Sequence, residues 1–286
     1  MDILEDILLR SKSLPETTNF DPENFKTNYL SKKKPIVLKG YANNWEAKRK
    51  WNLDFFSNLN NTKVTLEVGN IFQNETHFVK DDLSSYIEKL KEEEKTKVKT
   101  KTYLSLFNVF KTFPKLKQDI DFSIFTKFTK KNNTFAWIGP SGTISGFHWD
   151  TQNNILAQIK GEKLVLLVSP QYNKNMYKSK KYDAASVFSE VDINNYDENK
   201  HPKFKSAEIH SVVLKPGDAL FIPKGWWHYV KSLDVSISVN NFGYLLKDML
   251  FYRLIDSLKY RLHLLGLYGN KNCTCHKFID GKMVSK

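Results

Sequence analysis

The sequence has few cysteines and no long apolar segment. Its two cysteines, Cys273 and Cys275, are separated by one residue, which excludes the disulfide framework of a small secreted domain. No apolar run approaches the roughly 18 residues that a membrane-spanning helix requires. Near the N-terminus stand Glu5 and Asp6, acidic side chains where a secretory signal needs positive charge. We therefore expect an intracellular protein, cytoplasmic or nuclear, with no membrane partner.

Arginine is also scarce. Only four of the 44 basic residues are arginines, so the excess over 31 acidic residues, a formal net charge of +13, is almost wholly lysine spread through the chain. Lysine neutralises phosphate, but phosphate and base recognition usually recruits the planar guanidinium of arginine. RNA therefore stays a candidate partner, and we expect a protein substrate in preference to it.

The composition is otherwise that of a folded domain, with 41% hydrophobic and 14% aromatic residues among 286. Near the C-terminus, the segment Cys273-Thr274-Cys275-His276 could supply half of a zinc site. No second half is visible in the sequence, so a plain polar tail is the alternative interpretation.

Two separated motifs together suggest a metal site. His148 and Asp150 lie two residues apart in T-I-S-G-F-H-W-D, and the period of a strand would place both side chains on one face. His228 ends the motif I-P-K-G-W-W-H, after the apolar run 219–223. Two imidazoles and one carboxylate form the facial triad that holds ferrous ion and leaves positions open. The alternative is an ordinary strand histidine and a turn histidine.

Four motifs in order resemble one family. They are G-T-I-S-G-F-H-W-D, N-N-I-L-A-Q-I-K-G-E-K, K-P-G-D-A-L-F-I-P-K-G-W-W-H-Y-V and S-I-S-V-N-N-F. This series closely resembles the jumonji C (JmjC), or cupin-8-like, 2-oxoglutarate oxygenases. Within that family it is most similar to the small hydroxylase branch, which includes the asparaginyl hydroxylase that inhibits the hypoxia-inducible factor and the tRNA wybutosine hydroxylase.

The resemblance implies a mainly β fold with flanking helices, the double-stranded β-helix or cupin jelly roll. It divides the chain into N-terminal helices and outer-sheet strands at 1–125, a catalytic core at 126–243, and C-terminal helices and tail at 244–286. The long insertion 169–209 is expected to lie over the site. Related enzymes dimerise through such C-terminal helices, which suggests a homodimer. Capping of the protein's own barrel is an equal alternative.

The resemblance also implies which residues bind the co-substrate. Tyr103 matches a strand tyrosine that hydrogen-bonds the 2-oxoglutarate carboxylate, and packing is its alternative role. Ser145 matches a hydroxyl three residues before the first metal ligand. Strict alternation would point Ser145 away from His148, so this role requires an irregularity in the strand, for which Gly146 is the natural place.

Three more residues complete the implied co-substrate site. Lys163 stands at the mouth of an apolar strand, where a buried ammonium needs a partner such as the distal carboxylate of 2-oxoglutarate. Its alternative is to reach solvent at a hairpin. Asn154 and Asn240 match family positions near the co-substrate, and a turn residue and a solvated strand face are their respective alternatives.

The chemistry implied by the resemblance is oxidative, with Fe(II), 2-oxoglutarate and O2. A hydroxylated protein side chain is the first expectation for the product. Three alternatives belong to different classes: hydroxylation of a tRNA base, demethylation of N-methyl-lysine, and a binding module that has kept the fold without activity.

Overall fold

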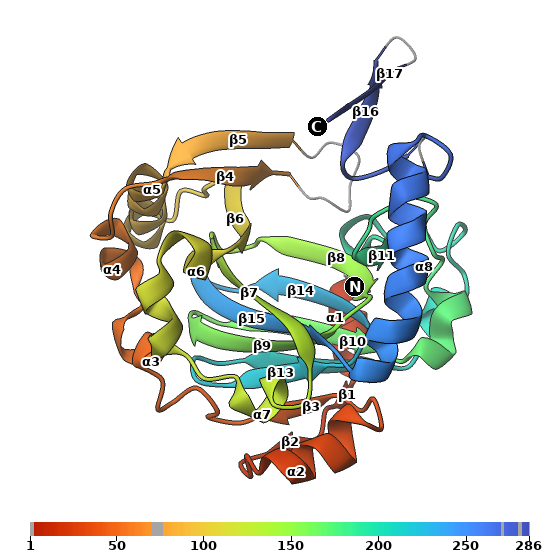
Figure 1. Cartoon of the computed structure of the whole chain (residues 1–286), viewed down its shortest axis with the longest axis horizontal. Helices are drawn as coiled ribbons and strands as arrows, with labels where there is room; N and C mark the ends of the chain where they lie inside the picture. The colour runs from red at the N-terminus through yellow and green to blue at the C-terminus, as the bar shows by residue number, and fades with distance from the viewer. Residues whose placement is uncertain (1–2, 70–76, 270–271, 280–281, 286) are drawn as a thin grey trace.

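The structure is a computed structural model that describes residues 3–69, 77–269, 272–279 and 282–285, without the side chains of residues 250–253 and 277–285. Two large β-sheets form the centre of the structure, and the expected mainly β jelly roll with flanking helices is confirmed (Figure 1). The six-stranded sheet has the order β1 (Lys12–Ser13), β12 (Ile209–Leu214), β10 (Lys163–Val168), β14 (Trp227–Ser232), β8 (Ile144–Asp150), β11 (Ser186–Phe188).

The second sheet has nine strands. In spatial order they are β2 (Glu16–Thr17), β3 (Ile36–Leu38), β13 (Ala219–Ile222), β9 (Asn153–Lys160), β15 (Ser236–Tyr244), β7 (Lys130–Gly139), β6 (Thr102–Phe107), β4 (Lys63–Val68), β5 (His77–Asp82). The N-terminal strands thus add to both edges of this sheet. A separate hairpin pairs β16 (His276–Ile279) with β17 (Lys282–Ser285).

The period of two along β10 divides its side chains between two cores. Val165 and Leu167 point between the sheets and pack with Leu156 and Leu220 of the facing sheet. The intervening leucines point to the outer side of the six-stranded sheet, where the N-terminal helix α1 (Ile3–Arg10) and the insertion cover them. Lys163 is in phase with Val165, so the sequence itself directs this lysine into the barrel.

The helices pack outside the sheets (Figure 1). The α-helices are α1 (Ile3–Arg10), α2 (Pro22–Phe25), α3 (Glu46–Lys50), α4 (Leu53–Ser57), α5 (Leu83–Thr96), α6 (Val109–Thr112), α7 (Ser123–Thr126), α8 (Leu246–Leu264). The remaining turns are the π-helix η1 (Lys26–Leu30) and the 3-10 helices η2 (Pro114–Asp119), η3 (Pro170–Asn175), η4 (Ile193–Asn195), η5 (Phe204–Ser206). Aromatic residues from α2 to α7 form the core against the outer side of the nine-stranded sheet.

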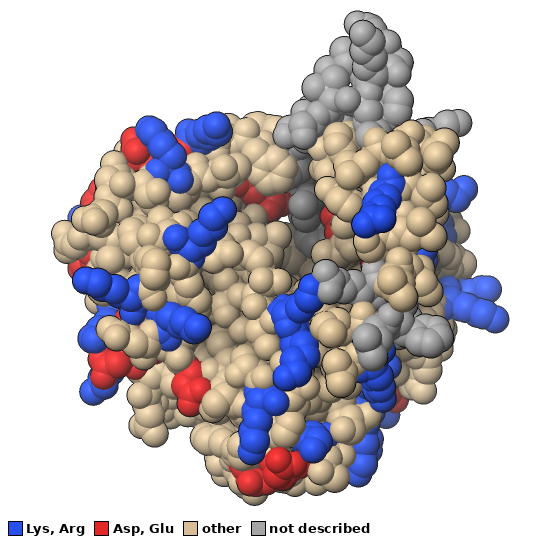
Figure 2. Space-filling model, in the orientation of Figure 1, with Lys and Arg blue, Asp and Glu red and all other residues tan. Residues whose placement is uncertain are grey.

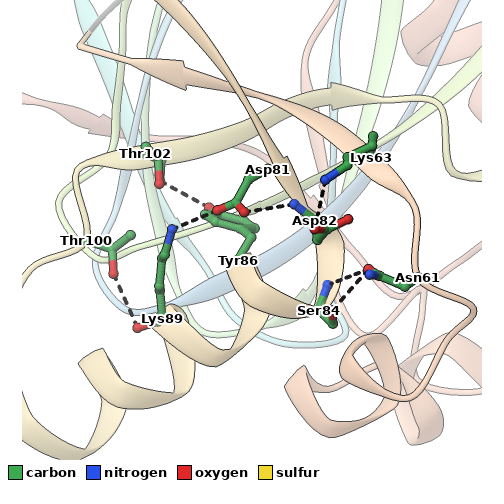
Figure 3. Close-up of polar contacts among 9 residues, drawn as sticks. All are labelled: Asn61, Lys63, Asp81, Asp82, Ser84, Tyr86, Lys89, Thr100 and Thr102. Carbon is green, nitrogen blue, oxygen red and sulfur yellow. Dashed lines mark hydrogen bonds and ion pairs between the residues drawn. The ribbon is translucent and has the colours of Figure 1, made fainter.

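Helix α5 fixes the strand that carries Tyr103. Its Tyr86 is fully buried, and the phenol faces the carbonyl oxygens of Thr102 at 3.1 Å and Ile138 at 2.9 Å while it accepts the N–H of Leu104 at 3.3 Å. Figure 3 shows this tyrosine reaching from the helix to Thr102. One side chain therefore ties β6 to β7 on both sides of Tyr103.

A second contact from α5 holds the turn that leads into β8. The buried carboxylate of Glu93 accepts hydrogen bonds from the N–H of Thr100 at 2.7 Å and from the N–H and hydroxyl of Ser141 at 3.0 Å each. Ser141 belongs to the turn between β7 and β8. The start of the expected metal strand is therefore anchored to a helix more than 40 residues earlier in the sequence.

The C-terminal helix α8 is one continuous helix with apolar side chains in solvent. Leu254 is 75% exposed and Leu258 is 58% exposed, so α8 does not bury these residues against the barrel. The expected homodimer through this helix stays a prediction. In the part of the chain that is described, no helix combines the length and the apolar character needed to cross a membrane.

Candidate active site

Strands β8 and β14 bring the two separated histidines together. They are antiparallel neighbours in the six-stranded sheet, and His228 pairs directly with His148. The next pair along is Val230 with Ser145, so β8 has one more residue than β14 over this interval. The expected irregularity between Ser145 and His148 is thus confirmed as a β-bulge. The bulge turns the side chain of Ser145 to the same side of the sheet as that of His148.

The three candidate metal ligands converge on one point. The Nε2 atom of His148 lies 3.9 Å from Oδ1 of Asp150, and Nε2 of His228 lies 3.5 Å from Oδ2 of the same carboxylate. One donor atom from each residue lies within 4.8 Å of the others. Two nitrogens and one oxygen at this separation are within reach of a single ion.

Both imidazoles are oriented by the same local device. Nδ1 of His148 contacts the carbonyl oxygen of Gly146 at 2.8 Å, and Nδ1 of His228 contacts that of Trp226 at 3.0 Å. A hydrogen bond from Nδ1–H to a carbonyl fixes the tautomer whose Nε2 lone pair is the metal donor. The side chains are therefore prepared for ligation through Nε2.

The surroundings also set the charge state of the site. Burial, and next the neighbouring His148, lower the pKa of His228 to about 4, so this ring is neutral at physiological pH and can act as a ligand. Asp150 is held from outside the triad, because the hydroxyl of Ser186 donates to its Oδ1 at 2.8 Å. Such an outer partner orients a ligating carboxylate.

The triad opens into a cavity of about 420 Å³ between the two sheets. All eight residues singled out from the sequence line this cavity. They are Tyr103, Ser145, His148, Asp150, Asn154, Lys163, His228 and Asn240. The structure therefore brings together every one of these positions from six different strands. Their individual roles stay predictions.

Lys163 is a buried lysine with no counter-charge among the described residues. Its side chain is 2% exposed, and among the described residues its Nζ has one hydrogen-bond partner, the phenol of Tyr103 at 3.4 Å. No carboxylate of the described residues pairs with it, and desolvation lowers its pKa to about 7. The expectation that it reaches solvent is excluded, and the arrangement fits an anionic ligand.

Two amides in the same wall have unmet hydrogen-bonding capacity. The Oδ1 atoms of Asn154 and Asn240 are buried and have no partner among the described residues. Buried polar atoms are nearly always paired in native proteins, so such atoms indicate a missing ligand or water. With Lys163 and Tyr103 they form a polar patch in the wall of the cavity.

Gly139 is a residue of this site that the sequence did not reveal. A Cβ atom added at Gly139 would lie 2.2 Å from the ring of Tyr103, so the tyrosine lies directly against the backbone of β7. Only glycine leaves this space. The signal in the sequence was a glycine at the end of a strand, which is too common to be specific.

The insertion supplies further unexpected residues. Strand β11 pairs with β8, with Ser186 opposite Asp150, and residues 183–186 form one wall of the cavity. The expected position of the insertion over the site is confirmed for this part. Ser186 was missed because a hydroxyl in a long polar loop carries no pattern. Glu67 of β4 also lines the cavity and was not among the residues singled out from the sequence.

A jelly roll whose interior combines a His-x-Asp and distant His triad with a buried lysine has the architecture of the cupin-type oxygenases. The comparison with protein families agrees, since a model described as a cupin-like domain matches residues 22–243. The chain belongs to this cupin-like JmjC family of Fe(II)- and 2-oxoglutarate-dependent oxygenases, and the resemblance seen in the sequence is confirmed.

The chain is also similar to individual members. It is 31% identical over 250 residues, 83% of this chain, to lysine-specific demethylase 8 of Xenopus tropicalis, and 33% identical over 248 residues, 82% of this chain, to the protein of that name in Danio rerio. These matches cover 54% and 59% of the two relatives, so the chain spans little more than half their length. JmjC domain-containing protein A of Dictyostelium discoideum is 30% identical over 229 residues, 76% of this chain and 90% of that protein.

The close approach at Gly139 generates a prediction about packing. Gly139→Ala should lower the free energy of unfolding by about 1 to 3 kcal/mol, because the added methyl group overpacks the contact with the Tyr103 ring. In a Tyr103→Ala background the same change should cost at least about 1 kcal/mol less. Urea denaturation of the four proteins measures both values. Equal costs in the two backgrounds would show that Tyr103 is not the obstructing group.

Proposed function

We propose that the chain is an Fe(II)- and 2-oxoglutarate-dependent oxygenase that hydroxylates a protein side chain. The observation that carries the proposal is the shared cavity: a two-histidine, one-carboxylate triad and a buried lysine line it together, and no carboxylate in the described part of the chain pairs with this lysine. A metal triad alone fits many chemistries. The added cation fits an anionic co-substrate bound next to the metal. We expect the protein in the cytoplasm or nucleus, where both are available.

The donor set fits ferrous iron. His148, Asp150 and His228 would hold it through two Nε2 atoms and one carboxylate, an arrangement that leaves coordination positions open. When bound, iron supplies the activation of O2, with 2-oxoglutarate converted to succinate and carbon dioxide and one oxygen atom inserted into a substrate C–H bond. The barrel contributes position and the exclusion of water.

The co-substrate is assigned to the polar patch deep in the barrel. Lys163 would pair with the distal carboxylate of 2-oxoglutarate, and the phenol of Tyr103 would donate a hydrogen bond to the same group, since the two polar atoms are 3.4 Å apart. Ser145, Asn154 and Asn240 would complete the hydrogen bonds; an amide can rotate to present its N–H groups. Burial raises the pKa of Tyr103 well above its usual range, so its proton is retained for donation.

Demethylation of N-methyl-lysine is the second candidate, and the names of the similar vertebrate proteins favour it. The reaction is the same insertion of oxygen, made at a methyl carbon bound to nitrogen. The resulting carbinolamine breaks its C–N bond and releases formaldehyde. Hydroxylation leaves the oxygen on the substrate, so the two outcomes differ in the mass of the product.

A nucleic-acid substrate receives little support from the charge distribution. Figure 2 shows lysine and arginine dispersed over one face of the molecule, with acidic and uncharged residues between them. Several lysines are already paired with carboxylates, such as Lys12 with Glu208 and Lys205 with Glu198. We therefore favour protein over tRNA as the substrate. A measurement of turnover distinguishes an active enzyme from an inactive binding module.

The first prediction tests the activity itself. The iron-loaded protein should convert 2-oxoglutarate to succinate, and His228→Ala should reduce the rate by more than about a hundredfold, because a ligand of the ion is lost without loss of the core. Matched control variants are Trp226→Phe and His210→Ala, which leave the triad intact. Mass spectrometry of captured peptides separates a gain of oxygen from loss of a methyl group. Succinate formation unchanged in His228→Ala would contradict the assignment of the triad.

The second prediction uses the lowered pKa of Lys163. The dicarboxylate binds the protonated lysine, so its affinity should be highest below pH 7 and fall by up to about tenfold per pH unit above pH 7. At pH 8.5 binding should take up close to one proton. Calorimetry in buffers of different ionisation enthalpy measures this uptake. The other titratable groups in the cavity are Glu67, Tyr103, the triad and Asp183.

The control is Lys163→Met, which keeps the length of the side chain and removes its charge. Its affinity for 2-oxoglutarate should be lower by about 3 to 5 kcal/mol, since a buried carboxylate loses its partner, and its proton uptake should disappear. Proton uptake that persists in Lys163→Met would assign the linkage to another group.

The third prediction concerns RNA. Replacement of Lys174, Lys178, Lys180 and Lys181 in the insertion by glutamine should leave turnover and the salt dependence of tRNA binding nearly unchanged. A matched control replaces four exposed lysines elsewhere, namely Lys111, Lys115, Lys117 and Lys130. tRNA binding is measured across a salt series. A steep salt slope that flattens only in the insertion variant, with turnover stimulated by tRNA, would instead support the tRNA hydroxylase.

A further inference from the structure

A second group of potential metal ligands lies at the C-terminal end of the described chain, outside the cavity. It consists of His263, Cys273, Cys275 and His276, whose ligand atoms all lie within 4.8 Å of one another. His263 belongs to the last turn of α8, Cys273 and Cys275 lie in the loop that enters β16, and His276 is the first residue of that strand. The sequence showed the three clustered residues, and the fold supplies the fourth from a helix ten residues earlier.

We propose that these four residues form a structural zinc site. Two imidazole nitrogens and two sulfurs are the donor set of closed, tetrahedral zinc sites. Zinc–ligand bonds of 2.0 to 2.3 Å place neighbouring donors about 3.3 to 3.8 Å apart in a tetrahedron. Nε2 of His263 lies 3.1 Å from Sγ of Cys275 and 3.2 Å from Nδ1 of His276. Donors at these separations need only small shifts to bind one ion.

The surroundings orient the donors as a metal site requires. Nδ1 of His263 contacts the carbonyl oxygen of Tyr268 at 2.8 Å, which leaves Nε2 as the donor facing the group. The backbone N–H of His276 points to Sγ of Cys273 at 3.3 Å, a contact that stabilises a ligating sulfur. His263 is fully buried and Cys273 is 3% exposed.

Packing of the His263 side chain does not by itself explain why four potential ligands gather here. The ring of His263 lies 4.4 Å from that of Tyr182, which is an ordinary aromatic contact. It does not require two sulfurs and a second imidazole on the other edge of the ring. A disulfide is the other alternative, but both cysteines are present as thiols and only one residue separates them. The spacing also differs from common zinc-finger patterns, which explains why the sequence did not reveal the site.

The ligand loop is attached to the wall of the catalytic cavity. Tyr182 donates its N–H to Asn272 at 2.8 Å and accepts the N–H of Thr274 at 3.1 Å, and the hydroxyl of Thr274 donates to Asp183 at 2.5 Å. Residues 183–186 line the cavity. Zinc would therefore fix the loop that holds this wall.

The experiment must separate this site from the triad, because zinc can also replace iron there. We would measure zinc by plasma mass spectrometry in the full chain carrying His148→Ala and His228→Ala, which disables the triad. One zinc per chain should remain after dialysis. Adding Cys275→Ser and His276→Ala should remove it. The proposal would be overturned if zinc is absent from the triad variant, or if zinc is retained after Cys275 and His276 are both replaced.

A second measurement covers the case in which the C-terminal variants do not fold. The triad variant is loaded with Co²⁺, which gives intense visible absorption and a sulfur-to-metal charge-transfer band when bound in a tetrahedral site with thiolates. We expect both bands, and slow reaction of the two cysteines with a thiol reagent until a chelator is added. A spectrum without the charge-transfer band, or thiols that react at the same rate with and without metal, would contradict the site.

Discussion

The candidate active site depends on the register between β8 and β14. The direct pairing of His148 with His228 joins two motifs that are far apart in the sequence, and both side chains must point inward at the same level. A slip of one residue would turn one histidine to the outer core, where Phe147 and Tyr229 pack. The bulge after Ser145 adds a third inward group without disturbing this pair. Apolar residues on the outer face therefore select the geometry of the ligands on the inner face.

Burial of the Lys163 ammonium group lowers the stability of the folded barrel. Its pKa, lowered from 10.5 to about 7, corresponds to a destabilisation on the order of 4 to 5 kcal/mol. The sign is that of a buried cation: the penalty is fully present below pH 7 and is lost as the pH rises from 7 to 10.5. The apolar cluster between the sheets, which includes Val165 and Leu220, stabilises the barrel and offsets this cost. An anionic ligand would pair with the ammonium group and offset this penalty. Its binding would therefore stabilise the folded barrel.

The sequence predicted the interior of the barrel better than its periphery. The family resemblance assigned Lys163, Asn154 and Asn240 to the co-substrate site, and the structure places all three in the wall of the cavity. The family resemblance supplied their partners. Contacts between distant segments could not be predicted: neither Gly139 against Tyr103, nor Ser186 on Asp150, leaves a periodic signal. The same limit applied to the C-terminal tail. The sequence showed three potential zinc ligands there, but the fourth, His263, lies in the preceding helix and carried no signal of its own.

The cavity wall at 183–186 is built differently from the wall that carries Lys163 and Tyr103. Lys163 lies on β10, which is paired without interruption with β12 and β14, and Tyr103 lies on β6, which Tyr86 ties to β7. The wall at 183–186 is held by three residue pairs of β11 with β8 and by hydrogen bonds to the loop at 272–274. Ala184 and Ala185 are exposed and contribute no core. The C-terminal segment that helps to hold this wall lies beyond the matched domain at 22–243. Under the proposed function, the part of the cavity nearest this wall would depend on residues outside the family's shared barrel.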